Sequence, residues 1–318
     1  MALLEVKNLS IGYHSQKGYL HAVEDVSFSL KAGKSLGFVG ESGCGKTTLC
    51  MALMRLLPPN GVIREGRILF EGKDLLKKSD EEMRKIRWKK IAMIFQAAMN
   101  ALNPVHRIED QIAEAILAHN PVYSKEEAMK NVEDLFMLVG IPKDRMRDYP
   151  HQYSGGMKQR AVIAMAMACL PTLMIADEPT TALDVIVQDQ ILKEIKGLQD
   201  RFKISIIFIS HDISIVSDVC DDIGVMYAGQ LVEYGDRQEV FSSPAHPYTK
   251  ALLSSYPTVT GEKCKLEPIP GEPPNLINQL SCCRFCDRCP SAGVLCKTES
   301  PVWLEITPTH RALCSSIR

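Results

Sequence analysis

Residues 40–48 have the sequence Gly40-Glu41-Ser42-Gly43-Cys44-Gly45-Lys46-Thr47-Thr48, which fits the pattern G-x-x-x-x-G-K-[ST]. A short apolar run, Ser35–Val39, precedes this loop and predicts a buried parallel strand, and a helix is predicted to follow over Lys46–Leu57. The glycines let backbone N–H groups surround a phosphate, and the helix N-terminus adds partial positive charge. We expect Lys46 to reach the β- and γ-phosphates of a nucleotide and the Thr47 hydroxyl to bind Mg²⁺. The alternative is a chance glycine-rich turn, which leaves the strand, the lysine and the threonine unexplained.

The loop alone does not separate a kinase, a GTPase and an ATPase. Its Cys44 has two interpretations, a small residue at a tolerant loop position or a reactive thiol, and the first is favoured.

The composition bounds the kind of protein. The 318 residues are 46% apolar, enough for a sizeable core, and 37 basic against 38 acidic residues give a net charge of −1. That balance gives no general attraction to nucleic acid or to an anionic membrane. The first ten residues lack the pattern of a signal peptide, and the longest apolar stretch, 161–176, is short and contains Pro171. We therefore expect a soluble protein whose contact with a membrane is peripheral.

Strand and helix patterns alternate along the chain. Short buried or alternating strands are predicted at Leu3–Leu9, Ala22–Leu30, Leu173–Ala176, Ser205–Ile209 and Ile223–Met226. The segment from about 97 to 169 is predicted to be helical, with a capping box at Ser124-Lys125-Glu126-Glu127. Strands that alternate with helices indicate a parallel α/β sheet. After Pro244 the chain becomes proline-rich, which is typical of a linker.

The strand over 173–176 ends in two acids, Asp177 and Glu178. A carboxylate at that position suits Mg²⁺ coordination, and the next suits a general base that orients an attacking water. The alternative is that these acids cap a helix.

A second anion site is predicted at Ser154, Gly155 and Gly156, because a serine and two glycines precede a helix. One nucleotide does not need two γ-phosphate sites in one chain. This second site therefore suits a nucleotide held by another copy.

Together these motifs resemble the ATP-binding cassette (ABC) family of transporter ATPases over residues 1 to about 250. Residues 40–47 resemble Walker A, residues 173–177 resemble Walker B, and residues 154–157 resemble the LSGGQ signature, with Tyr153 in place of leucine and Met157 in place of glutamine. Gln96 resembles the Q-loop glutamine, Ala182-Leu183-Asp184 the D-loop, and His211 the switch histidine. Tyr13 resembles the residue that stacks on adenine, with Tyr19 as the second choice.

The resemblance implies an α/β P-loop NTPase (RecA-like) core with an antiparallel β-subdomain, a helical insertion over about 97–170 and a cassette over 1–250. It assigns catalysis to Glu178, His211 and Gln96, and Mg²⁺ binding to Thr47, Gln96 and Asp177. It assigns nucleotide contacts to Tyr13, Gly40, Glu41, Ser42, Gly43, Cys44, Gly45, Lys46, Thr47, Thr48, Ser154, Gly155, Gly156 and Asp184.

The resemblance also implies partners. Two cassettes, identical or homologous, enclose two ATP molecules head to tail. They work with two transmembrane permease subunits and an extracytoplasmic substrate-binding protein, at the cytoplasmic face of the membrane and without nucleic acid.

Six of the eleven cysteines lie close together near the C-terminus: Cys282, Cys283, Cys286, Cys289, Cys296 and Cys314. The lack of an export signal implies a reducing cytosol, so a metal or a cluster is expected rather than disulfides. Four thiolates can hold an iron–sulfur cluster or tetrahedral zinc, and Cys286-x-x-Cys289 is an acceptable zinc half-site. The other spacings do not resemble common zinc folds and favour iron–sulfur. Redox-active or merely buried thiols are a third interpretation.

Residues 251–318 form an extension that resembles the one in dipeptide, oligopeptide and nickel importer ATPases. In that subfamily four such cysteines hold a [4Fe–4S] cluster, and the corresponding residues here are Cys283, Cys289, Cys296 and Cys314. Cys282 stands where the subfamily has glycine, and Cys286 is an extra cysteine. Three nearby arginines either offset the charge of a cluster or form a solvated basic patch: Arg284, Arg288 and Arg311.

The resemblance thus implies an ATPase that drives import of dipeptides or oligopeptides, with nickel as the alternative cargo. Two other functions are weighed, a non-transport cassette protein acting on ribosomes or DNA, and a metal-sensing module with a vestigial ATP site. Intact Glu178 and His211 argue against the vestigial site.

Overall fold

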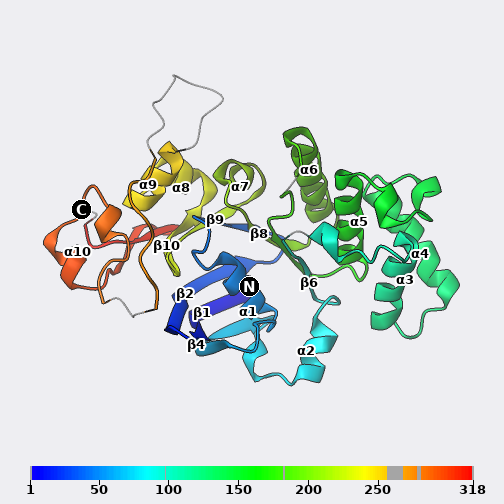
Figure 1. Cartoon of the computed structure of the whole chain (residues 1–318), viewed down its shortest axis with the longest axis horizontal. Coiled ribbons are helices and arrows are strands. Elements are labelled where there is room, and N and C mark those ends of the chain that lie inside the picture. Colours follow the sequence, from blue (N-terminus) through cyan, green and yellow to red (C-terminus); the bar gives the residue numbers. More distant parts are fainter. Residues whose placement is uncertain (1, 97, 182, 256–267, 278–280, 317–318) are drawn as a thin grey trace. The chain divides into compact units, whose positions relative to one another are not determined.

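The computed structural model describes residues 2–96, 98–181, 183–255, 268–277 and 281–316. The chain divides into two compact units (Figure 1). Unit 1 comprises Met1–Lys31, Ser35–Lys77 and Ile209–Arg318, and unit 2 comprises Ala32–Lys34 and Lys78–Phe208.

Unit 1 contains an antiparallel sheet of strand order β2-β1-β4-β5. These strands are β1 (Ala2–Ser15), β2 (Gly18–Lys31), β4 (Gly61–Phe70) and β5 (Lys73–Asp74). Strands β1 and β2 form a hairpin in which Val6 lies opposite Phe28. On the other side of β1, Val6 lies opposite Ile68 of β4. All three side chains are almost fully buried, so this face forms a core. The two predicted N-terminal strands are confirmed, and each is longer than its apolar alternation indicated.

The other strands of unit 1 have the order β11-β12-β10-β9-β3. They are β3 (Ser35–Val39), β9 (Asp222–Tyr227), β10 (Gln230–Asp236), β11 (Trp303–Thr307) and β12 (His310–Leu313). The central pair, β3 and β9, is parallel, whereas β9–β10, β10–β12 and β11–β12 are antiparallel. All five residues of β3 are buried, as its uninterrupted apolar sequence predicted. The C-terminal segment thus adds two strands to the sheet that carries the nucleotide loop.

Helices α1 (Lys46–Leu53), α7 (Ile213–Val219), α8 (Arg237–Ser242), α9 (Pro247–Ser254) and α10 (Val294–Thr298) complete unit 1, with the 3-10 turns Leu75–Lys77 and Cys286–Arg288. The prediction that α1 reaches Leu57 is wrong by one turn. Arg55 has a positive φ of 50°, and the Leu56 N–H donates to the Met51 carbonyl over 2.8 Å, which closes the helix. The linker expected after Pro244 is also wrong over α9, where Pro247 occupies the first helical turn and His246 caps it.

A buried carboxylate joins three parts of unit 1. Glu233 on β10 is completely buried and accepts hydrogen bonds from the Ala245 and His246 N–H groups, over 2.7 and 2.9 Å. His310 on β12 lies 2.7 Å away, from Nε2 to Oε1 of the same carboxylate. A buried charge is tolerated only when it is bonded in this way, so Glu233 fixes β10, α9 and β12 to one another.

Unit 2 contains β6 (Ile91–Ile94), β7 (Leu173–Asp177) and β8 (Ser205–Ile209), in the order β8-β7-β6, and β6 pairs with β7 in parallel. Its helices are α2 (Asp80–Ile86), α3 (Ile108–His119), α4 (Lys125–Leu138), α5 (Gly155–Met167) and α6 (Val185–Phe202). Short 3-10 turns occur at Ala98–Ala101, Lys143–Arg145 and Pro150–Gln152. Helices α3, α4 and α5 pack together (Figure 1).

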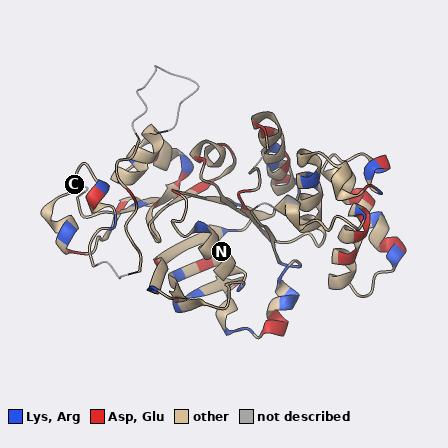
Figure 2. Cartoon of the chain, in the orientation of Figure 1, with Lys and Arg blue, Asp and Glu red and all other residues tan. Residues whose placement is uncertain are grey.

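The predicted capping box begins α4. The Ser124 side chain accepts from the Glu127 N–H over 3.2 Å, and the Glu127 carboxylate accepts from the Ser124 N–H over 2.7 Å. The apolar face of the helix then buries Ala128, Val132 and Leu135, as their spacing predicted. Basic and acidic residues are interspersed along α4, whereas α3 carries Asp and Glu without Lys or Arg, and α5 carries Lys and Arg without Asp or Glu (Figure 2).

Within the part of the chain that the structure describes, no helix combines the length and the apolar character needed to cross a bilayer.

Candidate nucleotide-binding and hydrolysis site

The predicted phosphate loop lies in unit 1 between β3 and α1. Two of its glycines could not be replaced: Gly40 has φ 149° and a Cβ there would lie 2.0 Å from the Met226 carbonyl oxygen. Gly45 has φ 104°, and its Cβ would lie 2.5 Å from the Ala22 carbonyl oxygen. The backbone is therefore confined to a path that only glycine allows. Thr47 and the loop residues Ser42 and Gly43 are exposed.

Lys46 is folded back onto its own loop. Its Nζ donates to the carbonyl oxygens of Gly40, over 2.7 Å, and Glu41, over 3.0 Å, and lies 3.4 Å from Cys44 Sγ. The side chain is only 6% exposed, so these bonds keep a buried ammonium satisfied. These contacts are carbonyl oxygens and a thiol, and a phosphate would give the Lys46 ammonium a negatively charged partner.

The structure contradicts a reactive Cys44. The thiol is 4% exposed, and burial raises its pKa, so the thiolate that reacts is disfavoured. Cys44 is a small packed residue of the loop.

The two candidate adenine-stacking tyrosines have different surroundings. The hydroxyl of Tyr13 lies 3.0 Å from the hydroxyl of Thr48 in the first turn of α1, which brings this tyrosine to the phosphate loop. Tyr19 instead stacks edge-on with His14 and His21, with ring centroids 5.2 and 5.0 Å apart.

The predicted hydrolytic residues of unit 2 meet at the end of β7. Asp177, the last residue of the strand, is 1% exposed. The next residue, Glu178, has a positive φ of 47°, an uncommon conformation for a residue with a side chain. Its Oε2 accepts hydrogen bonds from Gln96 Nε2, over 2.9 Å, and from the Thr181 hydroxyl, over 3.0 Å. The structure thus brings together Gln96 and Glu178, which lie 82 residues apart.

The predicted signature residues start α5. Ser154 is its N-cap, with Oγ accepting from the Met157 N–H over 3.3 Å, and both Ser154 and Gly155 are exposed. Exposed groups at the N-terminus of a 13-residue helix suit an anion brought by another molecule. Tyr153, which replaces leucine, is 5% exposed and bonds through its hydroxyl to the Arg145 carbonyl over 2.9 Å, so it serves packing.

Two further predicted residues stand at helix starts. Asp184 is the N-cap of α6 and accepts from the Val187 N–H over 3.0 Å. Its predicted neighbour Ala182 lies outside the described residues. His211 is exposed and follows β8, directly before Asp212, the N-cap of α7.

Three of the cysteines assigned to a cluster lie in the surroundings of the fourth, Cys283. Burial raises the pKa of Cys283 to about 11, and the thiols of Cys296, Cys314 and Cys289 add to that rise. The extra Cys286 lies near Asp287, Cys282 and Cys283, so it is also close to one of the four assigned cysteines. Among the described residues, however, no three His, Cys, Asp or Glu side chains are close enough to hold a metal ion as they stand.

The neighbouring arginines are not a solvated patch, contrary to one of the two interpretations. Arg284 and Arg288 are 5% and 7% exposed. Arg284 donates to the Ala228 carbonyl, and Arg288 is paired with Glu41 of the phosphate loop. Arg311, on β12, donates to the Ser27 carbonyl over 2.6 Å and stands 4.5 Å over the Trp303 ring.

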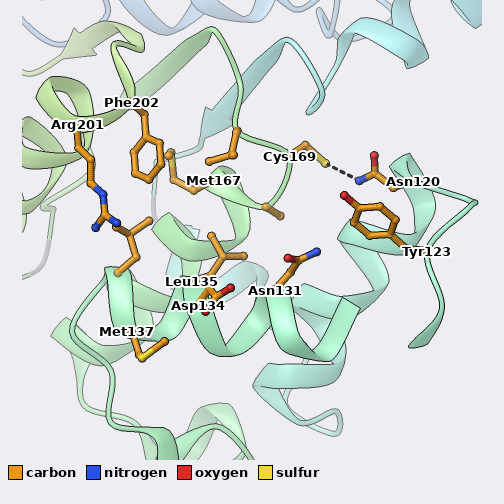
Figure 3. Close-up of a pocket in the computed structure, with 13 residues that line it drawn as sticks. Asn120, Tyr123, Asn131, Asp134, Leu135, Met137, Met167, Cys169, Arg201 and Phe202 are labelled. Atoms are coloured by element: carbon orange, nitrogen blue, oxygen red, sulfur yellow. Dashed lines mark hydrogen bonds between the residues drawn. The ribbon is translucent and has the colours of Figure 1, made fainter. Parts of the chain in front are cut away.

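A cavity of about 530 Å³ lies in unit 2 between α4 and the C-terminal ends of α5 and α6 (Figure 3). Asn120 donates to Cys169 at its wall, over 3.9 Å between nitrogen and sulfur. None of its lining residues belongs to the predicted ATP site.

Sequence reasoning missed Thr181 and, although it named Arg288, it did not predict the contact of Arg288 with Glu41. Thr181 lies three residues after Glu178, a spacing that could have drawn attention to it. Arg288 lies 247 residues from its partner Glu41, and no local pattern signals that contact.

Comparisons with known proteins agree with these features. Residues 23–181 match the family described as "ABC transporter", and residues 232–296 match "Oligopeptide/dipeptide transporter, C-terminal region". The chain is 47% identical over 312 residues to the dipeptide transport ATP-binding protein DppD of Lactococcus lactis, covering 98% of this chain and 89% of the relative. It is 47% identical over 313 residues to the oligopeptide transport ATP-binding protein OppD of Bacillus subtilis, covering 97% and 87%.

Solved structures give the same assignment. The dimeric bacterial ABC transporter cassette MJ0796 has a TM-score of 0.65 and 25% identity, covering 74% of this chain and 98% of its own. The cbiO1 protein from Clostridium perfringens, part of an ABC transporter complex, has a TM-score of 0.64 and 28% identity, covering 76% and 91%. The α/β P-loop NTPase fold is therefore confirmed. The chain belongs to the ABC transporter family, as an ATPase of its oligopeptide and dipeptide importer group.

Proposed function

We propose that this chain hydrolyses ATP to drive the import of dipeptides or oligopeptides through a membrane permease. The observation that carries the proposal is the fixed carboxylate of Glu178, held at the end of β7 by Gln96 and Thr181. A carboxylate placed in this way can orient a water for attack on a phosphate. The names of the two relatives above favour peptides over nickel as the cargo.

Each site residue then has a role. Lys46 leaves its loop carbonyls and binds the β- and γ-phosphates, while the N–H groups of residues 40–48 surround them. Glu178 orients the water, His211 contacts the γ-phosphate, and Tyr13 stacks on adenine. Catalysis consists mainly of positioning and of charge stabilisation.

Mg²⁺ fits the oxygen donors present. Thr47 offers an exposed hydroxyl, Asp177 a carboxylate and Gln96 an amide oxygen, which are hard ligands of the kind this ion prefers. When bound, the ion would offset the charge of the phosphates.

We also propose that the active form is a head-to-tail pair of ATPase subunits. Ser154, Gly155 and Gly156 of one copy bind the nucleotide held by the phosphate loop of the other, and Asp184 lies at the same junction. The support is the exposure of Ser154 and Gly155 at the start of α5 and the resemblance to a dimeric cassette. Such a pair would join two permease subunits at the cytoplasmic face of the membrane, with a substrate-binding protein outside.

For the C-terminal cysteines we propose a [4Fe–4S] cluster on Cys283, Cys289, Cys296 and Cys314, with zinc as the alternative. The support is that Cys289, Cys296 and Cys314 lie near Cys283, and the choice of these four cysteines over Cys286 rests on the resemblance to the importer ATPases. Their present separation means that the thiols must close around the cluster as it binds. The cluster would crosslink β12, α10 and the turn before it.

The decisive experiment uses Glu178→Gln. The amide keeps the size and the hydrogen bonds but not the carboxylate, so the variant should bind ATP, lose turnover and accumulate as a closed dimer on size-exclusion chromatography with ATP. Glu126→Gln, on the exposed start of α4, is the matched control and should behave as wild type. Equal turnover in Glu178→Gln and wild type would remove Glu178 from this role.

A further inference from the structure

The C-terminal extension contacts the phosphate loop at Glu41. Arg288, in the cysteine-rich turn, holds the Glu41 carboxylate in a fork, with Nη1–Oε2 and Nη2–Oε1 distances of 2.7 and 2.9 Å. The hydroxyl of Tyr248, on α9, accepts a hydrogen bond from the Glu41 N–H over 3.0 Å. All three residues belong to unit 1, and both partners of Glu41 come from beyond residue 247.

Arg288 is built into this position. Its Nε donates to the Pro270 carbonyl over 2.7 Å, and its Nη1 also reaches the Tyr227 hydroxyl at 3.3 Å. The guanidinium stands 5.6 Å over the Tyr227 ring, and the residue is 7% exposed. A buried arginine with a planar fork fixes its carboxylate partner in both distance and orientation, which a surface ion pair does not.

An aromatic cluster anchors the turn that carries Arg288. Phe285, 1% exposed, packs against Tyr227 and Tyr248 with ring centroids 5.1 and 5.4 Å apart, and these two tyrosines lie 4.6 Å from each other. Packed aromatic pairs stabilise beyond the area that they bury, so the turn is fixed to α9 and β9 rather than resting on them.

The constraint reaches the phosphate-binding lysine. Glu41 is held through its side chain by Arg288 and through its N–H by Tyr248, and its carbonyl oxygen receives Lys46 Nζ at 3.0 Å. Glu41, one of the two residues whose carbonyls hold Lys46, is therefore positioned from outside the loop. Gly40 and Gly43 on either side of this segment have φ values of 149° and 77°, conformations that favour glycine, so the backbone next to Glu41 follows a restricted path.

We propose that Arg288 is a positioning residue of the ATP site, and that through Glu41 the C-terminal extension sets the affinity of the phosphate loop for ATP. This inference rests on the proposed ATPase function and adds a regulatory element to it. Any change that displaces the turn 285–288 lowers nucleotide binding, although the residues of the turn do not themselves contact ATP.

The test measures ATP affinity by equilibrium binding, together with KM and kcat, in Arg288→Met and Glu41→Gln. Each should weaken ATP binding about tenfold or more, the cost expected when one partner of a buried charge pair is truncated, with KM raised more than kcat is lowered. Arg288→Lys keeps the charge but loses the fork and should be intermediate. The double variant should be no weaker than the worse single variant, because both disrupt one interaction.

Arg311→Gln is the control, since Arg311 lies in the same extension but contacts Ser27 and Trp303 instead of the loop. It should retain wild-type affinity. If Arg288→Met does not fold, Glu41→Gln carries the test, because it retains the bonds of Arg288 to Pro270 and Tyr227. Provided that wild type hydrolyses ATP, either of two results would overturn the inference. One is an ATP affinity in Glu41→Gln equal to that of wild type, and the other is a loss of ATP affinity in Arg311→Gln as large as that in Arg288→Met. A wild type that neither binds nor hydrolyses ATP would overturn the proposed function instead.

Discussion

Gln96 donates a hydrogen bond from its side-chain amide to the carboxylate of Glu178 over 2.9 Å, although the two residues come from different strands. The same oxygen of Glu178 also receives the Thr181 hydroxyl, at 3.0 Å. Since β6 and β7 are parallel neighbours, their carboxyl ends lie at one edge of the sheet, and this is what brings the two side chains together. The glutamine therefore orients the proposed base in addition to its proposed role toward Mg²⁺.

The first prediction separates these two roles of Gln96. Gln96→Ala removes one of two hydrogen bonds to Glu178, so kcat should fall roughly tenfold, because a hydrogen bond to a charged group contributes about 1.5 kcal/mol or more and about 1.4 kcal/mol is a factor of ten. Thr181→Val removes the other bond and leaves the amide in place. ATPase assays over a Mg²⁺ titration should show a similar loss of kcat in both variants, with a raised Mg²⁺ requirement in Gln96→Ala alone.

Two results would contradict this reading. If Thr181→Val has wild-type kcat, the position of Glu178 does not depend on these bonds. If Gln96→Ala leaves the Mg²⁺ requirement unchanged, Gln96 is no ligand of the ion.

Features encoded by neighbouring residues were predictable. The bounds of β3 and β8 follow from uninterrupted apolar runs, and the start of α4 follows from its capping box. The end of α1 was missed, because the positive φ of Arg55 has no signal in its residue type.

Contacts between distant segments were not predictable in the same way. The motifs identified Gln96 and Glu178 separately, but their hydrogen bond depends on strand order, which a single sequence does not contain. The pair of Arg288 with Glu41 depends further on where the C-terminal strands join the sheet. Arg288 carried two open interpretations for this reason, and burial decided against the solvated one.

A second prediction concerns two glycines of unit 2, of which Gly140 has a positive φ and Gly197 has a helical backbone. Gly140 has φ 66°, and a Cβ there would lie 2.6 Å from Nη1 of Arg160, which is bonded to the Val139 carbonyl. Gly140→Ala should therefore lower the free energy of unfolding by about 1–2 kcal/mol. Gly197→Ala, within α6 and with open space around it, should raise it by about 0.5–1 kcal/mol. Urea denaturation measures both, and changes of the same sign would contradict the backbone argument.

A third prediction concerns acid stability. Burial lowers the pKa of His246 to about 4, with Glu233 opposing part of that shift. The unfolded chain, with a histidine pKa near 6.5, binds a proton between about pH 6.5 and 4 that the folded chain does not. The stabilising contribution of neutral His246 is thus present above about pH 6.5 and is lost as the pH falls toward 4, by at most about 3 kcal/mol.

The variant His246→Asn tests this linkage, because asparagine can still cap α9 but does not titrate. Urea midpoints measured from pH 7 to pH 4.5 should fall less steeply in this variant than in wild type. The exposed His14→Asn is the control and should keep the wild-type slope. Equal slopes in wild type and His246→Asn would show that another group governs acid unfolding.

The last prediction distinguishes cluster ligands from the cysteines beside them. Cys283 has the other three proposed ligands as neighbours, so Cys283→Ser should abolish a [4Fe–4S] cluster. Cys286 lies close to Cys283 but is an extra cysteine relative to the importer ATPases, so it is the matched control, and Cys286→Ser should keep the cluster. Anaerobically purified wild type and Cys286→Ser should be brown, with about four iron atoms per chain, whereas Cys283→Ser should be colourless. Colourless wild type with one zinc ion would replace the cluster by a zinc site. Loss of that zinc in Cys286→Ser would then place Cys286 among its ligands, as half of the Cys286-x-x-Cys289 pair.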